Sequence, residues 1–179
     1  MKKRLLAFAI CAAFGTGMAH ANVINGGFET GNLNGWTVSG YTGYTGVDGY
    51  AQSGNYAAAL GAVGSLDFLS QTLSTIPGAQ YNLSYWLASD GRTANEFSVS
   101  WGGTALSDLM NIAAQPYTFY TYNVMATSAS TVLTFGSRDD PGYLHLDSIN
   151  VTPAIPEPAS LALFGIGLAG LGALFRRKQ

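Results

Sequence analysis

The sequence predicts an all-β fold, an antiparallel β-sandwich, for the central part of this 179-residue chain. Three observations support this fold class. Hydrophobic and polar residues alternate over several short stretches, and no stretch keeps the period of an amphipathic helix. Turn-forming pairs of residues also separate these stretches at intervals of roughly ten residues, as is typical of sandwiches and barrels.

The alternation is clearest in the second half of the chain. Tyr81, Leu83 and Tyr85 occupy one face of a predicted strand, and Trp86 lies on the opposite face. Residues 22–64 are less regular, and we expect them to form long loops at one end of the sandwich. In chain order, the predicted strands are Trp36–Ser39, Tyr56–Leu60, Ser65–Leu73, Gln80–Ser89, Glu96–Trp101, Thr118–Ala126, Ser130–Gly136 and Tyr143–Thr152.

The first 21 residues form a predicted signal peptide. Residues 2–4 are basic, Leu5–Phe14 are apolar, and a small-x-small site ends at Ala21. This order is that of a cleaved secretory signal, so we expect the mature chain to begin at Asn22. An uncleaved N-terminal anchor is the alternative.

The C-terminal end has three consecutive parts. Residues 153–158 form a proline-rich linker, residues 159–175 form an uncharged apolar run, and residues 176–179 include Arg176, Arg177 and Lys178. The apolar run is just long enough to cross a membrane as a helix, and the basic residues stop it on the cytoplasmic side. Retention as a permanent single-pass anchor is the alternative to later removal.

Without these ends, the chain is strongly acidic. Residues 22–155 contain two arginines, no lysine and nine acidic residues, which gives a formal charge of −7. A nucleic-acid binder needs a basic surface, so this class is excluded, and binding to an anionic membrane surface is disfavoured. The only cysteine, Cys11, lies in the signal peptide, so the mature chain has no disulfide. We expect one domain over residues 22–152.

The C-terminal end resembles a known sorting signal. Pro156-Glu157-Pro158, the apolar span and the basic end are similar to the PEP-CTERM signal of Gram-negative bacteria. The resemblance implies processing near this motif by an exosortase, after a transient stay in the inner membrane. It also implies delivery to the cell surface or to the extracellular matrix of a biofilm.

The central part resembles a second family. The family's characteristic segments here are Asn25–Glu29, Leu33–Trp36, Ser70–Leu73, Tyr81–Trp86 and Leu146–Val151. They are similar to calcium-containing β-jelly-roll carbohydrate-binding modules of the galactose-binding-like fold. The resemblance implies a jelly roll over residues 22–152. It also implies a structural calcium ion held by a glutamate and an aspartate, here Glu29 and Asp147.

The residues around Asp147 independently suggest a special geometry. Leu144 and Leu146 share one face of the predicted strand, whereas Ile149 and Val151 restart the apolar set one residue out of phase. Such a slip predicts a β-bulge at Asp147, and bulges redirect side chains. Carboxylates suit Ca²⁺, which takes six to eight oxygen ligands. The alternative is that Glu29 and Asp147 only accept hydrogen bonds from loop amides.

Four aromatic residues are candidates for binding glycans. Aromatic rings stack on the apolar faces of sugars, and the candidates are Trp86, Trp101, Tyr120 and Tyr122. The alternative for each is core packing, because aromatic side chains dominate the cores of sandwiches.

No motif indicates catalysis. His145 is the only histidine after signal removal, and no nucleophile or zinc-binding motif accompanies it. We therefore expect a non-catalytic surface or matrix protein that contacts glycans, with exopolysaccharide as a partner. The alternatives are a structural or adhesion protein without a sugar site, and a small polysaccharide-active enzyme.

Overall fold

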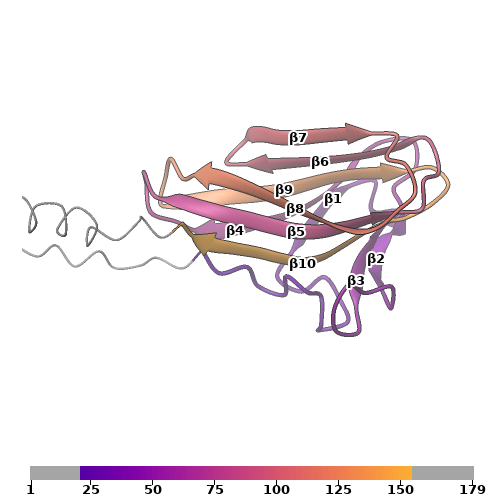
Figure 1. Ribbon diagram of the computed structural model, residues 1–179, viewed down its shortest axis with the longest axis horizontal. Coiled ribbons are helices and arrows are strands. Elements are labelled where there is room, and N and C mark those ends of the chain that lie inside the picture. The colour runs from indigo at the N-terminus through magenta and orange to yellow at the C-terminus, as the bar shows by residue number, and fades with distance from the viewer. Residues whose placement is uncertain (1–20, 155–179) are drawn as a thin grey trace, which may run out of the picture.

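Two antiparallel β-sheets pack face to face in the computed structural model, which describes residues 21–154 (Figure 1). One five-stranded sheet has the order β1-β4-β9-β6-β7, and the other has the order β2-β3-β10-β5-β8. This architecture confirms the all-β sandwich. The Pro156-Glu157-Pro158 motif, the predicted helix 159–175 and the basic residues 176–178 lie outside the described residues.

Ten strands and one short 3-10 helix make up the described chain. They are β1 (Thr37–Gly40), η1 (Thr42–Tyr44), β2 (Thr45–Asp48), β3 (Ala57–Leu60), β4 (Asp67–Ser74), β5 (Gln80–Ser89), β6 (Asn95–Trp101), β7 (Thr104–Met110), β8 (Gln115–Met125), β9 (Ser130–Asp139) and β10 (Leu144–Pro153). No helix among these residues is long and apolar enough to span a membrane.

The core lies between the two sheets, on the faces that the alternation predicted. Tyr81, Leu83 and Tyr85 of β5 are fully buried. The Tyr85 ring packs at 5.4 Å from Phe135 of β9 and at 5.7 Å from Phe97 of β6, measured between ring centroids. Large aromatic side chains therefore join the two sheets through the centre of the sandwich.

The sequence missed two strands. Residues 22–64 contain the expected long loops, at 22–36 and 49–56, together with the predicted β1 and β3, but also β2, which was not predicted. Strand β2 has only four residues, so it offers too little alternation to recognise. Strand β7 was also missed, because Leu106 is an extra residue opposite Val99 and Ser100 of β6 and interrupts the alternation of β7.

The bulge predicted at Asp147 is confirmed. The pairing of β10 with β5 shifts register between Asp147 and Asn150, and Ser148 has a positive φ of 52°. A single extra residue here returns Ile149 and Val151 to the core face. Asp147 itself follows Leu146 in regular alternation and points to the opposite face of the sheet.

The described chain begins and ends at the same end of the sandwich (Figure 1). The N–H of Ala154 donates to the carbonyl of Gln80, where β5 starts, at 2.8 Å. The β5–β6 and β9–β10 loops lie at the opposite end, which we call the loop end.

Candidate functional site

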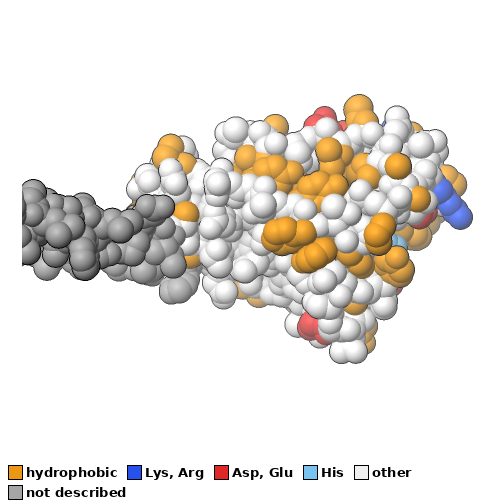
Figure 2. All heavy atoms as spheres, in the orientation of Figure 1, with side chains coloured by type: hydrophobic (Ala, Val, Ile, Leu, Met, Phe, Trp, Pro, Cys, Tyr) orange, Lys and Arg blue, Asp and Glu red, His pale blue; other side chains and the backbone are white. Residues whose placement is uncertain are grey.

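An aromatic band crosses the outer face of the sheet β2-β3-β10-β5-β8 towards the loop end. Figure 2 shows hydrophobic side chains gathered mainly on the half of the visible face that is nearer the loop end. The members of the band come from β5, β8, β10 and the adjoining loops. They are Tyr50, Trp86, Tyr117, Phe119, Tyr143 and His145.

Trp86 and Phe119 form the centre of the band. Tyr85 is fully buried, so its neighbour Trp86 points to the outer face, because successive side chains of a strand alternate. Trp86 pairs in register with Phe119 of β8, and their ring centroids lie 5.2 Å apart. Phe119 is 51% exposed and Trp86 is half-buried. The pair thus offers an accessible aromatic surface.

Three further rings extend the band towards the loop end. Tyr50 stacks on Tyr117 at 5.7 Å and lies 4.7 Å from the ring of His145. The Tyr117 hydroxyl donates to the carbonyl of Tyr50. His145 Nε2 lies 3.0 Å from Asp48 Oδ2. These contacts fix the β2–β3 loop against the sheet.

The Tyr117 phenol is a hydrogen-bond donor under ordinary conditions. Its burial, and then the negative charges of Asp147 and Asp48, raise the pKa of Tyr117 above its usual value. The hydroxyl therefore keeps its proton and its bond to Tyr50.

A field of small polar side chains continues from the aromatic band along the same face. The pairing registers place Asn150, Ser84 and Thr121 in one row across β10, β5 and β8. The next row contains Thr152, Asn82 and Asn123. We call these six residues the polar field.

The polar field carries hydroxyls and amides but no charge. Five of its six residues are exposed and Ser84 is half-buried. Hydroxyl and amide groups both donate and accept hydrogen bonds. Aromatic rings beside uncharged donors and acceptors are what a neutral sugar requires.

Tyr120 and Tyr122 occupy the opposite face of β8. Both rings stack on the buried Tyr85, with centroids 5.3 and 6.1 Å away. The hydroxyls of Tyr85 and Tyr122 are 3.3 Å apart. These two tyrosines therefore pack at the edge of the core, as the alternative interpretation expected.

Trp101 also packs in the core, as the alternative interpretation expected. Its side chain is 4% exposed and packs 5.9 Å from the Tyr81 ring. Its Nε1–H donates to the carbonyl of Met125 at 3.0 Å. The enclosed Trp101 ring therefore does not present an open face on the surface for a sugar to stack on.

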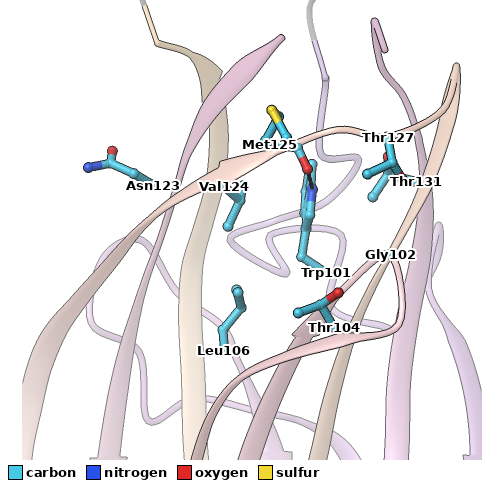
Figure 3. A pocket seen from close by; sticks show the side chains of 9 residues that line it. All are labelled: Trp101, Gly102, Thr104, Leu106, Asn123, Val124, Met125, Thr127 and Thr131. Carbon is cyan, nitrogen blue, oxygen red and sulfur yellow. Dashed lines mark hydrogen bonds between the residues drawn. The ribbon is translucent and has the colours of Figure 1, made fainter. Parts of the chain in front are cut away.

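A cavity of about 290 Å³ lies beside Trp101, where the two sheets separate at β7 and β8 (Figure 3). Leu106 and Val124 line its apolar side, and Thr104 lines its polar side. Asn123 of the polar field lies at its rim. The cavity is at the end of the sandwich where the described chain starts and finishes, away from the aromatic band.

The structure brings Glu29 and Asp147 to one loop, residues 49–56. Asp147 is fully buried, and its Oδ2 accepts the N–H groups of Gln52 at 2.8 Å and Ser53 at 3.1 Å. Its Oδ1 accepts the N–H of Ser148. Burial raises the pKa of Asp147, while these hydrogen bonds oppose the rise.

Glu29 holds the next part of the same loop. Its carboxylate accepts the N–H groups of Asn55 and Tyr56, each at 3.0 Å. These bonds lower the pKa of Glu29, with the bond from Tyr56 contributing most. A Cβ placed on Gly27 would lie 3.8 Å from both Asp147 Oδ1 and Glu29 Cγ, so the two acids flank this glycine.

Every oxygen of these two carboxylates already accepts a backbone N–H. A calcium ion would compete with the amides for the same lone pairs, so the arrangement does not require one. Across residues 21–154, no three His, Cys, Asp or Glu side chains form a metal-binding group. Calcium at Glu29 and Asp147 is therefore a proposal taken from the family resemblance.

Sequence reasoning missed most of the aromatic band. Trp86 was identified by alternation, but Tyr50, Tyr117, Phe119 and His145 were not. The signal for Phe119 was present, because it alternates with Tyr120. What the sequence lacked was the register of β8 on β5, which sets Tyr120 against Tyr85 and turns Phe119 outward.

Comparison with known proteins gives one sequence match. Residues 154–178 match the model of the PEP-CTERM protein-sorting motif. The chain therefore carries this sorting motif, as the C-terminal sequence indicated. No curated protein matches the chain.

Solved structures with the same fold are mainly carbohydrate-binding modules. One is a family 61 module in complex with β-1,4-galactotriose, with a TM-score of 0.57, 19% identity, and coverage of 74% of this chain and 98% of the module. Another is the CBM22-1 xylan-binding domain of Xyn10C from Paenibacillus barcinonensis, with a TM-score of 0.54, 18% identity, and coverage of 79% and 99%.

An enzyme also contains a similar sandwich. The enzymatically active domain of tailspike protein 4 from bacteriophage CBA120 matches with a TM-score of 0.56 and 17% identity. The match covers 75% of this chain but only 21% of the tailspike chain. At these identities the likeness concerns the fold alone.

Proposed function

We propose that this chain is an exported, non-catalytic surface or matrix protein that binds a neutral glycan. The observation that carries the proposal is the accessible pair formed by Trp86 and Phe119, beside the uncharged polar field. The fold shared with modules that bind galactotriose and xylan supports the same class of ligand.

The sorting motif supports delivery to the cell surface. We infer that the chain is exported, held in the membrane by its C-terminal segment for a time and processed by an exosortase; the match to the sorting motif supports this. In the sequence the motif follows directly after β10, and β10 ends at the end of the sandwich opposite the loop end. A protein attached there would present the aromatic band away from its attachment point.

The charge of the domain favours a neutral ligand. Residues 22–155 have a formal charge of −7, and both of their arginines lie outside the aromatic band and the polar field. An anionic polysaccharide would be repelled by this surface. A neutral glycan, or one bearing amino groups, meets no such barrier.

A glycan array tests the proposal. The exported protein should bind neutral β-linked glycans, and Trp86→Ala should abolish the signal. Phe68→Ala is the matched control, because Phe68 is 37% exposed but lies on β4, in the other sheet. A blank array with folded wild-type protein would contradict glycan binding and support the structural or adhesion role.

The enzymatic alternative needs a separate assay. Glu96 of β6 lies in a small depression beside Arg138, on the sheet opposite the aromatic band. Release of reducing sugars from exopolysaccharide, abolished by Glu96→Ala, would support a hydrolase instead.

A further inference from the structure

Asp139, at the end of β9, is a buried carboxylate with no hydrogen-bond partner. Its exposure is 0%, and among the described residues neither of its side-chain oxygens accepts a hydrogen bond. A buried acid is normally paired or hydrogen-bonded, because removing it from water without compensation is costly. Asp139 therefore differs from Asp147, whose oxygens are all satisfied.

The charge of a second carboxylate, that of Asp90 in the β5–β6 loop, acts on Asp139. Gly142, in the turn after β9, is near both residues, and its N–H donates to the backbone carbonyl of Asp139 at 3.2 Å. A Cβ placed on Gly142 would lie 2.2 Å from Asp90 Oδ2. Burial, and then the charge of Asp90, raise the pKa of Asp139 to about 6, while the N–H of Gly142 and the charge of Arg92 oppose the rise.

Neither neighbouring arginine donates a hydrogen bond to Asp139 or to Asp90 Oδ2. Arg138 pairs with Asp140, whose Oδ2 also accepts the N–H of Gly64. Arg92 lies 3.6 Å from Asp90 Oδ2, beyond hydrogen-bonding distance, and it donates to the carbonyl of Pro141. The Arg92 side chain is 61% exposed, so it can move aside into solvent.

Two carboxylates with three oxygens that accept no hydrogen bond, one of them facing Arg92 at 3.6 Å, suit a hard divalent cation. Ca²⁺ takes carboxylate, carbonyl and water oxygens in flexible geometry, and carboxylates may bind it through one or both oxygens. The three acids here exceed the two arginines by one negative charge, so a cation would also relieve their repulsion.

We propose that Asp139 and Asp90 bind a calcium ion at the loop end of the sandwich. Asp139 supplies both oxygens from the buried side, Asp90 supplies Oδ2 from the opposite loop, and water completes the coordination shell. The ion would join the β5–β6 loop to the β9–β10 loop. Tyr143 of the aromatic band lies in the β9–β10 loop, so the ion would also restrict the motion of Tyr143.

This site is separate from Glu29 and Asp147. Those two acids accept hydrogen bonds from the β2–β3 loop, and among the described residues they share no hydrogen-bond partner with Asp90 or Asp139. The two calcium proposals can therefore fail or succeed independently, and neither depends on glycan binding.

Thermal unfolding and calorimetric titration with CaCl₂ at pH 7.5 test the proposal on the full chain. For wild type, calcium at about 100 times its Kd should raise the melting temperature by roughly 5–10 °C. Asp139→Asn and Asp90→Asn should each remove this rise and reduce the calcium stoichiometry by one. Asp108→Asn, an exposed acid on β7, should behave like wild type.

The melting temperature of Asp139→Asn in EDTA shows whether the variant folds without calcium. In EDTA it should melt at or above the temperature of wild type, because the substitution removes an uncompensated buried charge. Calcium stabilisation of Asp139→Asn equal to that of wild type would overturn the proposal. The absence of calcium binding by wild-type protein would overturn it as well.

Discussion

Trp86 of β5 and Phe119 of β8 are register partners whose rings meet at 5.2 Å on the outer face of one sheet. Their planes are inclined by 52°, so the two rings form an angled surface rather than a flat stack. Each ring limits the rotation of the other. The accessible aromatic surface is therefore a property of the pair.

This relationship predicts coupled effects on glycan binding. Trp86→Ala should weaken binding at least about tenfold, since buried aromatic contacts dominate binding energy. Phe119→Ala should cost a similar factor by freeing the Trp86 ring. Calorimetric titration of both single variants and the double variant measures the coupling. Independent, additive losses would contradict a shared surface.

Substitution of Trp101 should reduce the stability of the fold rather than glycan binding. Trp101→Ala removes an enclosed ring and leaves the carbonyl of Met125 without its donor. The free energy of unfolding should fall by about 3–5 kcal/mol. Phe119→Ala, an exposed aromatic substitution, is the control and should cost much less. Urea denaturation compares the two, and equal losses would contradict the placement of Trp101 in the core.

Asp67 predicts a specific pH dependence. It is 1% exposed at the start of β4, and Ser137 donates to one of its oxygens while the other has no partner among the described residues. Burial raises the pKa of Asp67 from 3.8 to about 6. The folded state therefore favours the protonated acid.

The sign of the effect follows from linkage. Protonated Asp67 stabilises the folded state relative to ionised Asp67. This stabilisation is fully present below the pKa of the unfolded chain, near 3.8, and is lost as the pH rises through about 6. The free energy of unfolding changes by about 3 kcal/mol over this range. In EDTA, Asp67→Asn should gain stability relative to wild type between pH 4 and pH 7. Asp108→Asn should show no such trend. A constant difference between Asp67→Asn and wild type would contradict the shifted pKa.

Calcium at Glu29 and Asp147 is testable in the Asp139→Asn background, where the loop-end site is removed. A bound ion must displace amides of residues 52–56, so it should change the hydrogen exchange of Gln52, Ser53, Asn55 and Tyr56 and raise the melting temperature. Unchanged exchange and melting would assign both acids to loop anchoring alone. Asp147→Ala should still destabilise the fold, because it leaves buried N–H groups unpaired.

The sorting motif predicts the fate of the C-terminal segment. Replacing Pro156-Glu157-Pro158 with three alanines should leave the uncleaved chain in the inner membrane. Mass spectrometry of the protein from membranes and medium gives both mature termini. Release of the alanine variant with the same C-terminus as wild type would contradict processing through this motif.

The strands with long, regular alternation could be predicted from the sequence. Strand β5 was predicted with its true bounds, and the bulge at Asp147 followed from a one-residue phase slip. Strand β2 escaped prediction because its four residues are held by pairing with β3 rather than by their own pattern. Alternation of hydrophobic and polar residues identifies a strand only where it continues over more residues than would alternate by chance.

The sequence by itself determined the fold class, the acidic charge of the domain and the C-terminal sorting motif. It also determined that Trp86 lies opposite Tyr85, because that relation is set within one strand. Only the tertiary structure decided which aromatic residues gather around Trp86 and which acids lack partners. Phe119 meets Trp86 through strand register, and the charge of Asp90 acts on Asp139 through the packing of two loops. These depend on contacts between residues far apart in the chain, which no local pattern encodes.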